Sequence, residues 1–300
     1  MSSHNYYLNH ASLWQITWKK IKRDRNAILG ITVLLIIIAA ILFLPLIYQT
    51  SVDEIDFSIS SAPPSWNHPF GTNDLGQDQL ARILYGGKIS LTVGITATLV
   101  SMLVGTLVGA IAGFYGGIID GILMRITDLF LALPQLPLLL LIVYLFRDSL
   151  KNILGAELGI FVLVVIIIGI LNWMSVARLV RANFLKLREM EFVSAAKAMG
   201  AKPSRIIWVH LFSNVVSTVI VAGTLAVGNA IITESTLSFL GLGFPPDVPT
   251  WGRMLFDAKD YITSAPHMAL FPGLAIFLTV LSINYIGDGL RDALDPRENI

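Results

Sequence analysis

Long apolar runs separated by shorter polar stretches form the main pattern of this chain. A transmembrane helix needs about 20 mostly apolar residues to cross roughly 30 Å of hydrocarbon. Backbone amides in lipid must hydrogen-bond within their own segment, so continuous apolar windows of this length indicate helices rather than strands. The pattern therefore predicts an all-α integral membrane protein with six transmembrane helices, namely Ala27–Tyr48, Ile89–Gly113, Ile122–Phe146, Leu158–Ala177, Val215–Ile232 and His267–Gly287.

The composition supports a membrane protein. Of the 300 residues 55% are hydrophobic and only 14% are charged, and the mean hydropathy is +0.72, well above the usual range of soluble domains. Cysteine is absent, which excludes disulfides, thiolate metal sites and a cysteine nucleophile. The net charge of +1 gives no general attraction to nucleic acid. The first window follows a polar arm and lacks a cleavage pattern, so we interpret it as an uncleaved anchor.

The distribution of Lys and Arg predicts the orientation. Five basic residues precede the first window between Lys19 and Arg25, and seven stand between the fourth and fifth windows. Cytoplasmic loops carry an excess of Lys and Arg, so both termini are predicted to be cytoplasmic. The chain then divides into a cytoplasmic arm (1–26), a first transmembrane helix (27–48), an extracytoplasmic loop (49–88), a core with five helices and a cytoplasmic loop 183–212 (89–290) and a cytoplasmic tail (291–300).

Small residues recur every four positions in the second window, at Gly105, Gly109 and Gly113. Such a row lets two helix backbones approach closely. The row predicts helix packing, either within this chain or against a second membrane subunit, and the spacing does not decide between the two.

No energy source is apparent within the chain. A phosphate-binding loop reads G-x-x-x-x-G-K-[ST], and the stretch from Gly86 to Ser90 lacks both its first glycine and the Ser/Thr after lysine. An ion-coupled carrier needs ionisable groups deep in the membrane. The clear ionisable residues within the predicted windows are Arg125 and Asp128. Their spacing suggests an interfacial i,i+3 pair rather than a proton relay. The scattered histidines form neither a metalloprotease nor a hydrolase motif, and we predict no catalytic or metal-binding residues.

The cytoplasmic stretch "SAAKAMGAKPSRIIWVH" interrupts the apolar pattern. Spacing of i, i+3, i+4 and i+7 places four residues on one face of a helix: Phe192, Ala195, Ala196 and Met199. Gly200 fits the left-handed residue that ends a helix, and Pro203 fits the first turn of the next helix. The pattern predicts a helical hairpin with a flat patch of small side chains that can enter the groove of a partner.

Two other interpretations of this hairpin stay open from periodicity, and a third is rejected. The face can pack on the protein's own helices, or the hairpin can lie on anionic lipid through Lys197, Lys202 and Arg205. A DNA-binding helix-turn-helix is disfavoured, because the basic residues do not gather on the second helix.

The hairpin resembles the EAA loop of ABC-type importer permeases, which reads E-A-A, three residues, G, and later H-x-x-P-N. Ala195, Ala196, Gly200, His210 and Asn214 match that pattern. Ser194 stands where the family has Glu, and Ser213 where it has Pro. The resemblance implies an ATPase-docking set consisting of Phe192, Ser194, Ala195, Ala196, Met199, Gly200, His210 and Asn214.

The rest of the chain is similar to the C-type permease of dipeptide, oligopeptide and nickel importers. The matching segments are "HPFGTNDLGQDQLARILYGGKISL", "ESTLSFLGLGFPPDVPTWGRML" and "FPGLAIFLTVLSINYIGDGLRDALDPR". The resemblance implies a type I ABC importer permease fold in the cytoplasmic membrane of a prokaryote. It also implies a homologous second permease, two cytoplasmic ATPases that use ATP, and an extracytoplasmic solute-binding protein as partners, with no cofactor on this chain.

On this basis the chain is expected to be a non-catalytic permease subunit that imports di- or oligopeptides. Nickel or another small solute, export by the same architecture, and an ion-coupled carrier are the alternatives. If the four-residue face docks the ATPase, Ala196→Glu and Gly200→Asp leave membrane insertion intact and uncouple hydrolysis from uptake. Outside the membrane, Trp66, Trp251 and the Gly71–Gly76 turn are expected to form the lip that receives the binding protein. Anchoring of a lone tryptophan at the membrane interface is the alternative.

Overall fold

In a computed structural model that describes residues 13–294, all the named secondary-structure elements are helices. Within that range the β-type pairing is a single bridge between Thr72 and Asp78. The elements in chain order are α1 (Leu13–Ile21), α2 (Arg25–Ile47), η1 (Phe57–Ile59), α3 (Gln79–Tyr115), α4 (Gly117–Ala132), α5 (Gln135–Leu154), α6 (Ala156–Ile170), α7 (Trp173–Arg188), α8 (Glu191–Ala198), α9 (Pro203–Arg205), η2 (Ile206–Leu211), α10 (Phe212–Phe239), α11 (Trp251–Ala258), η3 (Lys259–Tyr261) and α12 (His267–Leu294).

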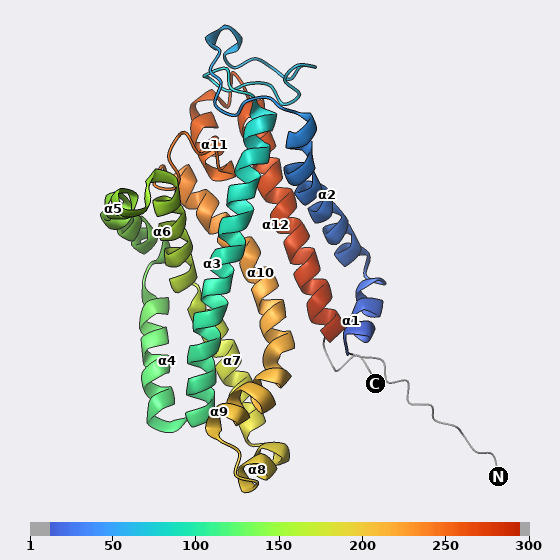
Figure 1. The fold of residues 1–300 in the computed structure, drawn as a ribbon, viewed down its shortest axis with the longest axis vertical. Coiled ribbons are helices and arrows are strands. Elements are labelled where there is room, and N and C mark those ends of the chain that lie inside the picture. Colours follow the sequence, from blue (N-terminus) through green and yellow to red (C-terminus); the bar gives the residue numbers. More distant parts are fainter. Residues whose placement is uncertain (1–12, 295–300) are drawn as a thin grey trace, which may run out of the picture.

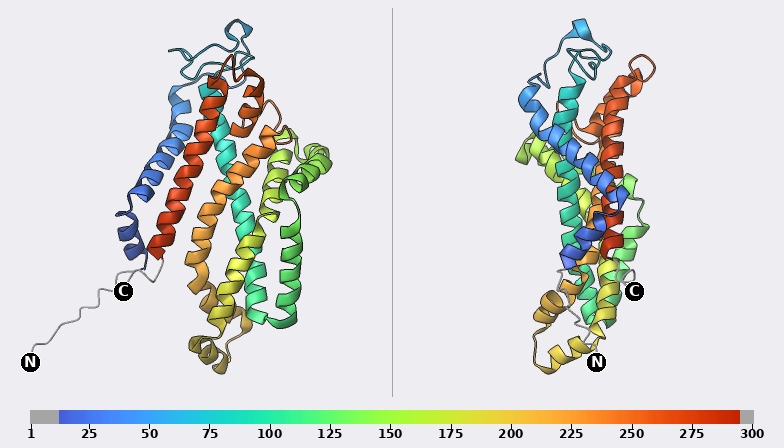
Figure 2. Two further views of the ribbon diagram at one scale, coloured as in Figure 1. Left: turned by 180° about the vertical axis from the view of Figure 1, so that it is seen from behind. Right: turned by 90° about the vertical axis from the view of Figure 1, so that its right-hand side faces the viewer.

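The long helices run side by side along one axis of an elongated bundle (Figures 1 and 2). The segment between α2 and α3 lies at one end, while α8, α1 and the C-terminal end of α12 lie toward the other. The described parts of the predicted arm, hairpin and tail thus lie toward one end of the bundle, and the prediction that this end is cytoplasmic stays a prediction. Five of the six predicted windows correspond to helical segments long and apolar enough to cross a membrane, namely Arg25–Ile47, Gln79–Tyr115, Ala156–Arg188, Pro203–Phe239 and His267–Leu294.

The third predicted window, Ile122–Phe146, is not one straight helix. It is broken between α4 and α5, whose axes differ by 87°, so it counts as a sixth span only if the bent pair is taken together. Pro134 causes the break, because the residue before a proline is disfavoured in the helical conformation. Leu133 accordingly takes an extended ψ of 139°. The helix α5 therefore runs across the bundle (Figure 1).

Two predicted boundaries also change. The helix α3 begins at Gln79, so the last ten residues of the predicted loop 49–88 are helical. Asp78 fixes this start, because its side chain accepts a hydrogen bond from the Ala81 amide at 2.7 Å and satisfies a free donor of the first turn. The predicted arm 1–26 contains the short helix α1. Its residues 1–12, and residues 295–300 of the predicted tail, lie outside the described part of the chain.

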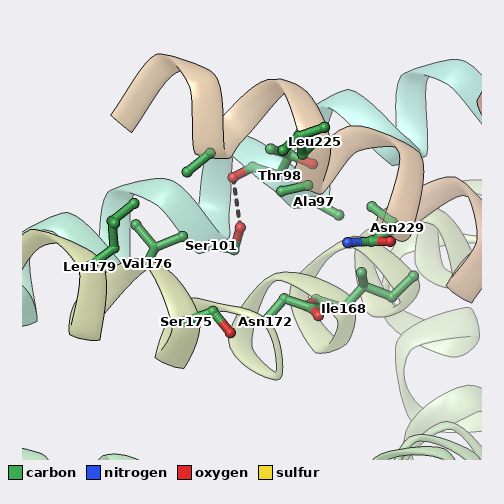
Figure 3. A pocket seen from close by; sticks show the side chains of 13 residues that line it. Ala97, Thr98, Ser101, Ile168, Asn172, Ser175, Val176, Leu179, Leu225 and Asn229 are labelled. Atoms are coloured by element: carbon green, nitrogen blue, oxygen red, sulfur yellow. Dashed lines mark hydrogen bonds between the residues drawn. The ribbon is translucent and has the colours of Figure 1, made fainter. Parts of the chain in front are cut away.

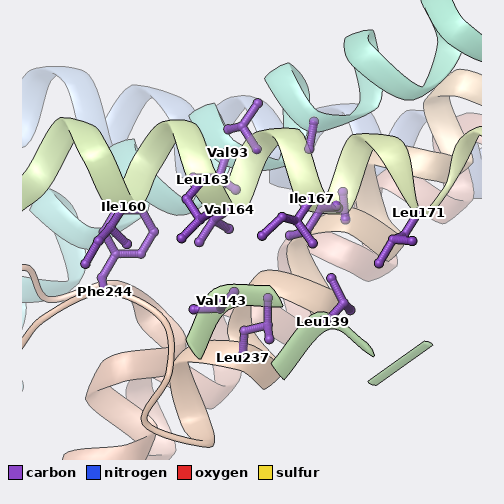
Figure 4. Packing of buried hydrophobic residues seen from close by; sticks show 14 of the residues in the cluster. Val93, Leu139, Val143, Ile160, Leu163, Val164, Ile167, Leu171, Leu237 and Phe244 are labelled. Carbon is purple, nitrogen blue, oxygen red and sulfur yellow. The ribbon is translucent and has the colours of Figure 1, made fainter. Parts of the chain in front are cut away.

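A buried cluster holds α5 in its crosswise position (Figure 4). Leu139 and Val143, one helical turn apart on α5, are fully buried and pack against residues such as Val164 of α6. Leu237 of α10 and Phe244 of the following loop complete the same cluster. Each fully buried apolar side chain of this size stabilises the packing by about 1.5–3 kcal/mol, so the bend is fixed by tertiary contacts.

The glycine row of α3 packs within this chain, against α7. A Cβ added at Gly105 would lie 2.6 Å from the Trp173 carbonyl oxygen, and one added at Gly109 would lie 2.4 Å from that of Ala177. At Gly113 it would meet the Phe184 Cβ at 2.5 Å. These distances are shorter than carbon and oxygen atoms tolerate. The α3 and α7 backbones therefore touch along a line that only glycine permits.

Candidate functional site

The elbow, which we define as residues 191–211, joins α7 to α10. The helix α8 ends at Ala198, and Gly200 follows with φ of +78°. This left-handed conformation suits glycine, as predicted. Pro203 stands in the first turn of α9, also as predicted, where its missing N–H has no helical partner to lose. The two signals together fold the chain back under the bundle (Figure 1).

The inner face of the elbow is anchored in the protein's own core. Val193 is fully buried and Ala196 is only 2% exposed. Both pack in a cluster with residues of α7, η2 and α10, among them Phe184, Ile206 and Leu211. The prediction that Ala196 lies on the exposed docking face is therefore wrong. The helix α8 has two adjacent apolar stripes along its length. The periodicity of the sequence does not tell which stripe faces the core.

The outer face of the elbow carries the other three residues of the predicted helix face. Phe192 is 39% exposed and Met199 is 82% exposed, and Ala195 between them is also exposed. These three residues are spaced i, i+3 and i+7, so they form a short apolar stripe. Ser194 is exposed on a neighbouring side of the helix. The stripe is short, apolar and exposed, so it can enter a groove on another protein.

The elbow continues into α10 through a π-helical turn. Residues Ile206–Leu211 form η2, and the Phe212 amide donates to the Ile207 carbonyl, five residues earlier. Asn214 stabilises this junction, because its side-chain Nδ2 donates to the His210 carbonyl oxygen at 2.6 Å. Ser213 is exposed here. Single π-turns are frequent at functional sites, and here the π-turn shapes the junction without a proline.

Ion pairs tie α7, which leads into the elbow, to its neighbour α4. Arg181 donates to Asp120 through Nε and Nη2, both at 2.5 Å, and this bidentate geometry fixes orientation as well as distance. Asp128 accepts from Arg178 Nη2 at 2.5 Å. The expected pair between Arg125 and Asp128 is thus wrong, since the carboxylate turns to the other helix.

Ala196→Glu is expected to unfold the elbow rather than to disturb docking alone. A carboxylate at this buried position has no cationic partner in the cluster, and an uncompensated buried charge costs at least about 3 kcal/mol. Trypsin should then cleave the solubilised subunit at basic residues of the elbow, such as Lys197 and Arg205, much faster than in the parent protein. Ala195→Glu is the matched control, because it adds the same charge on the exposed stripe; equal protection of both variants would contradict the assignment.

At the opposite end of the bundle, Asp78 joins three segments of the first external loop. Its Oδ2 accepts from the Tyr48 hydroxyl at 2.7 Å and lies 2.8 Å from His68 Nδ1, while its Oδ1 caps α3. Burial, followed by the hydrogen bond to Asp78, raises the pKa of Tyr48 to about 12. The phenol therefore stays protonated and keeps donating to the carboxylate.

A second buried carboxylate, Glu234, joins α3, α10 and the start of α11. Glu234 is fully buried and accepts from Ser238 at 2.8 Å and from Ser90 at 3.2 Å. The Ser90 hydroxyl also accepts from the Trp251 amide at 3.4 Å. We call this set of contacts around Glu234 and Ser90 the outer clamp. The predicted fifth window ends at Ile232, whereas α10 runs on to Phe239, so the sequence prediction left Glu234 outside the helix.

The predicted external lip is only partly exposed. Trp251 is 1% exposed, and its indole Nε1 donates to the Ile83 carbonyl oxygen at 3.0 Å, so its expected place on the lip is wrong. Trp66 is fully exposed, whereas the Gly71–Gly76 turn is largely buried and so does not form the lip as expected; its two glycines have φ of +75° and +77°. Trp66 thus remains available for contact with another molecule.

The structure also shows polar residues within the bundle that the sequence prediction did not select. Asn172, Ser175 and Asn229 line a cavity between α3, the α6–α7 break and α10 (Figure 3). The signal that could have found them is simple: each is a polar residue inside or beside an apolar window, where its hydrogen-bonding groups need partners.

The comparisons place this geometry in a family. Residues 105–300 match the binding-protein-dependent transport system inner membrane component family, and residues 12–64 match the N-terminal transmembrane domain of oligopeptide transport permease C. The dipeptide transport system permease protein DppC of Alkalihalophilus pseudofirmus is 43% identical over 95% of this chain and 90% of its own length. The glutathione transport system permease protein GsiD of Salmonella typhimurium is 40% identical, with the same coverage.

A solved structure gives the same fold. The inward-facing MetNI methionine ABC transporter matches with a TM-score of 0.56 and 17% identity, over 72% of this chain and 98% of the matched chain. At that identity the match speaks for the fold. Together with the exposed elbow, the matched family and the close relatives lead to one conclusion: this chain is a multi-pass membrane protein of the binding-protein-dependent transport system inner membrane component family, with the fold of an ABC importer permease.

Proposed function

We propose that the chain is the non-catalytic permease subunit of a prokaryotic importer that carries short peptides across the cytoplasmic membrane. The observation that carries this proposal is the exposed stripe of Phe192, Ala195 and Met199 on an elbow anchored in the core by Val193. An anchored elbow with an exposed apolar face can transmit force from a cytoplasmic partner to the helices, because its own residues hold it rigidly to the bundle.

Two cytoplasmic ATPases are the proposed source of that force, and a homologous second permease is the proposed partner in the membrane. A groove on each ATPase would accept one elbow, with Gly200, His210 and Asn214 shaping its turn and its junction to α10. ATP would be used by those partners, since the stretch nearest to a phosphate loop, around Lys88, lacks the required pattern. Trp66 is the proposed contact for an extracytoplasmic solute-binding protein.

Peptide is the proposed solute because the similar DppC and GsiD proteins are named for dipeptide and glutathione transport. Glutathione is itself a peptide, so the two names share one chemistry. The test is uptake of a radiolabelled dipeptide into proteoliposomes that contain the chain with its second permease, ATPases and binding protein. We expect uptake that requires ATP and stops when either the ATPases or the binding protein is omitted.

Alternatives predict different results in the same assay. Uptake by the purified chain alone, driven by a proton gradient, would indicate an ion-coupled carrier and overturn the proposal. ATP-dependent uptake of nickel without uptake of any dipeptide would keep the architecture and overturn the substrate. ATP-dependent movement of dipeptide away from the side that carries the ATPases would indicate export.

A further inference from the structure

A half-open cavity of about 300 Å³ lies beside the break between α6 and α7. The break separates α6 from α7 at Leu171 and Asn172, and Asn172 has a non-helical ψ of 0° with φ of −119°. The helices α3 and α10 form the other walls (Figure 3). Irregular backbone at membrane depth occurs where it is buried in protein or lines a water-filled cavity.

Neutral polar side chains from three helices converge on this cavity. Asn172 is held in place, because its Nδ2 donates to the Ile168 carbonyl at 2.7 Å and its Oδ1 accepts from Gln135 Nε2 at 3.3 Å. Thr98 of α3 is only 4% exposed, yet its hydroxyl has no hydrogen-bond partner. Within residues 13–294, the exposed Asn229 amide and Ser175 hydroxyl also make no hydrogen bond.

The unsatisfied groups exclude lipid as the filling of the cavity. A hydroxyl or amide that faces hydrocarbon without a partner is costly, and polar residues in membrane helices usually face a bundle interior or water. Asn229 and Ser175, which are both exposed, would incur this cost together if acyl chains filled the space. Water and a polar solute satisfy both the donors and the acceptors of these groups.

We propose that this cavity is part of the solute path and that Asn229, Ser175 and Asn172 bind the backbone amides of the transported peptide. This inference rests on the proposed function as a peptide importer. Side-chain amides carry both donors and acceptors, so they match the N–H and C=O groups of a peptide bond. This match between side-chain amides and the peptide backbone does not depend on which side chains the peptide carries.

The residues that line the cavity also favour a peptide over a nickel ion as the solute. None of the residues around the cavity is ionisable, whereas a bound nickel ion prefers ligands such as imidazole nitrogen. The volume lies at the small end of the range for ligand pockets, roughly 300–1,000 Å³. A short peptide presents mainly the N–H and C=O groups of its backbone. Such a solute fits a small, uncharged site that carries side-chain amides.

The test uses single cysteines, because the chain has no native cysteine. In the complete complex in membranes, Asn229→Cys is expected to react rapidly with a charged, water-soluble methanethiosulfonate reagent and to be protected by saturating dipeptide during turnover. Ile36→Cys is the control, since Ile36 lies in the apolar α2 and is 63% exposed. A cysteine there is expected to face lipid and to stay unreactive.

A second variant measures binding. Asn229→Ala is expected to raise the KM for dipeptide uptake by about 2- to 10-fold, the effect of losing one neutral hydrogen bond, with co-purification of the second permease unchanged. An unreactive Asn229→Cys, reactivity that dipeptide does not alter, or loss of the second permease from Asn229→Ala would overturn the inference, the last because the residue would then belong to a subunit seam. If the parent complex imports no peptide at all, the proposed function fails instead, whatever the labelling shows.

Discussion

Ala195→Glu is expected to abolish ATP-driven uptake while the folded permease remains in the membrane. Ala195 lies between Phe192 and Met199 on the exposed stripe of the elbow, so a carboxylate there would enter the partner's groove without a counter-charge. Such a change weakens docking by about 2 kcal/mol or more, or roughly 30-fold. Uptake of labelled dipeptide and co-purification of the ATPases measure the effect directly.

The matched control for this variant is Ser194→Glu. It adds the same side chain to the next exposed position of α8, where the resembled EAA loop has glutamate. We expect uptake close to that of the parent protein. Loss of uptake in both variants, with the ATPases still bound, would show that the stripe is not the docking contact.

Gly109→Leu is expected to separate α3 from α7 and to destabilise the subunit. The first added carbon would already lie 2.4 Å from the Ala177 carbonyl oxygen and 2.8 Å from the Val180 Cβ, so the backbones must move apart. Overpacking of this kind costs roughly 2–3 kcal/mol. The midpoint of thermal unfolding of the purified subunit should then fall by roughly 5–10 °C, which tryptophan fluorescence measures.

Gly121→Leu provides the control for that experiment. Gly121 lies in the middle of α4, and a Cβ added there meets no atom within 4 Å. Leucine also favours the helical conformation more than glycine does, so the midpoint should stay the same or rise slightly. If Gly109→Leu and Gly121→Leu lower the midpoint equally, general sensitivity to leucine and not the α3–α7 contact explains the loss.

The sequence predicts most of the long helices because their signal is a simple sum over about 20 apolar residues. It fails where single residues override that sum. Pro134 turns one window into two helices at 87°, and Asp78 starts α3 ten residues early. Hydropathy averaged over a window does not register either effect, although both residues are visible in the sequence.

The sequence predicts only part of the candidate site, and the reason differs from that for the helices. Gly200 and Pro203 carry strong local constraints, and both have the predicted conformation. The inward or outward direction of α8 depends on what packs beneath it, so Ala196 was assigned to the wrong face. The ion pair of Asp128 with Arg178 spans 50 residues, and periodicity within one helix detects only partners three or four positions away.

The length of α3 has a consequence for how the two sides of the membrane communicate. With 37 residues, it is about 56 Å long, nearly twice the hydrocarbon thickness. Its outer end is fixed by the clamp at Ser90 and Glu234, and its inner end lies along α7 at Gly113. A single stiff rod therefore joins the two aqueous compartments, so that tilting one end displaces the other without any intervening joint.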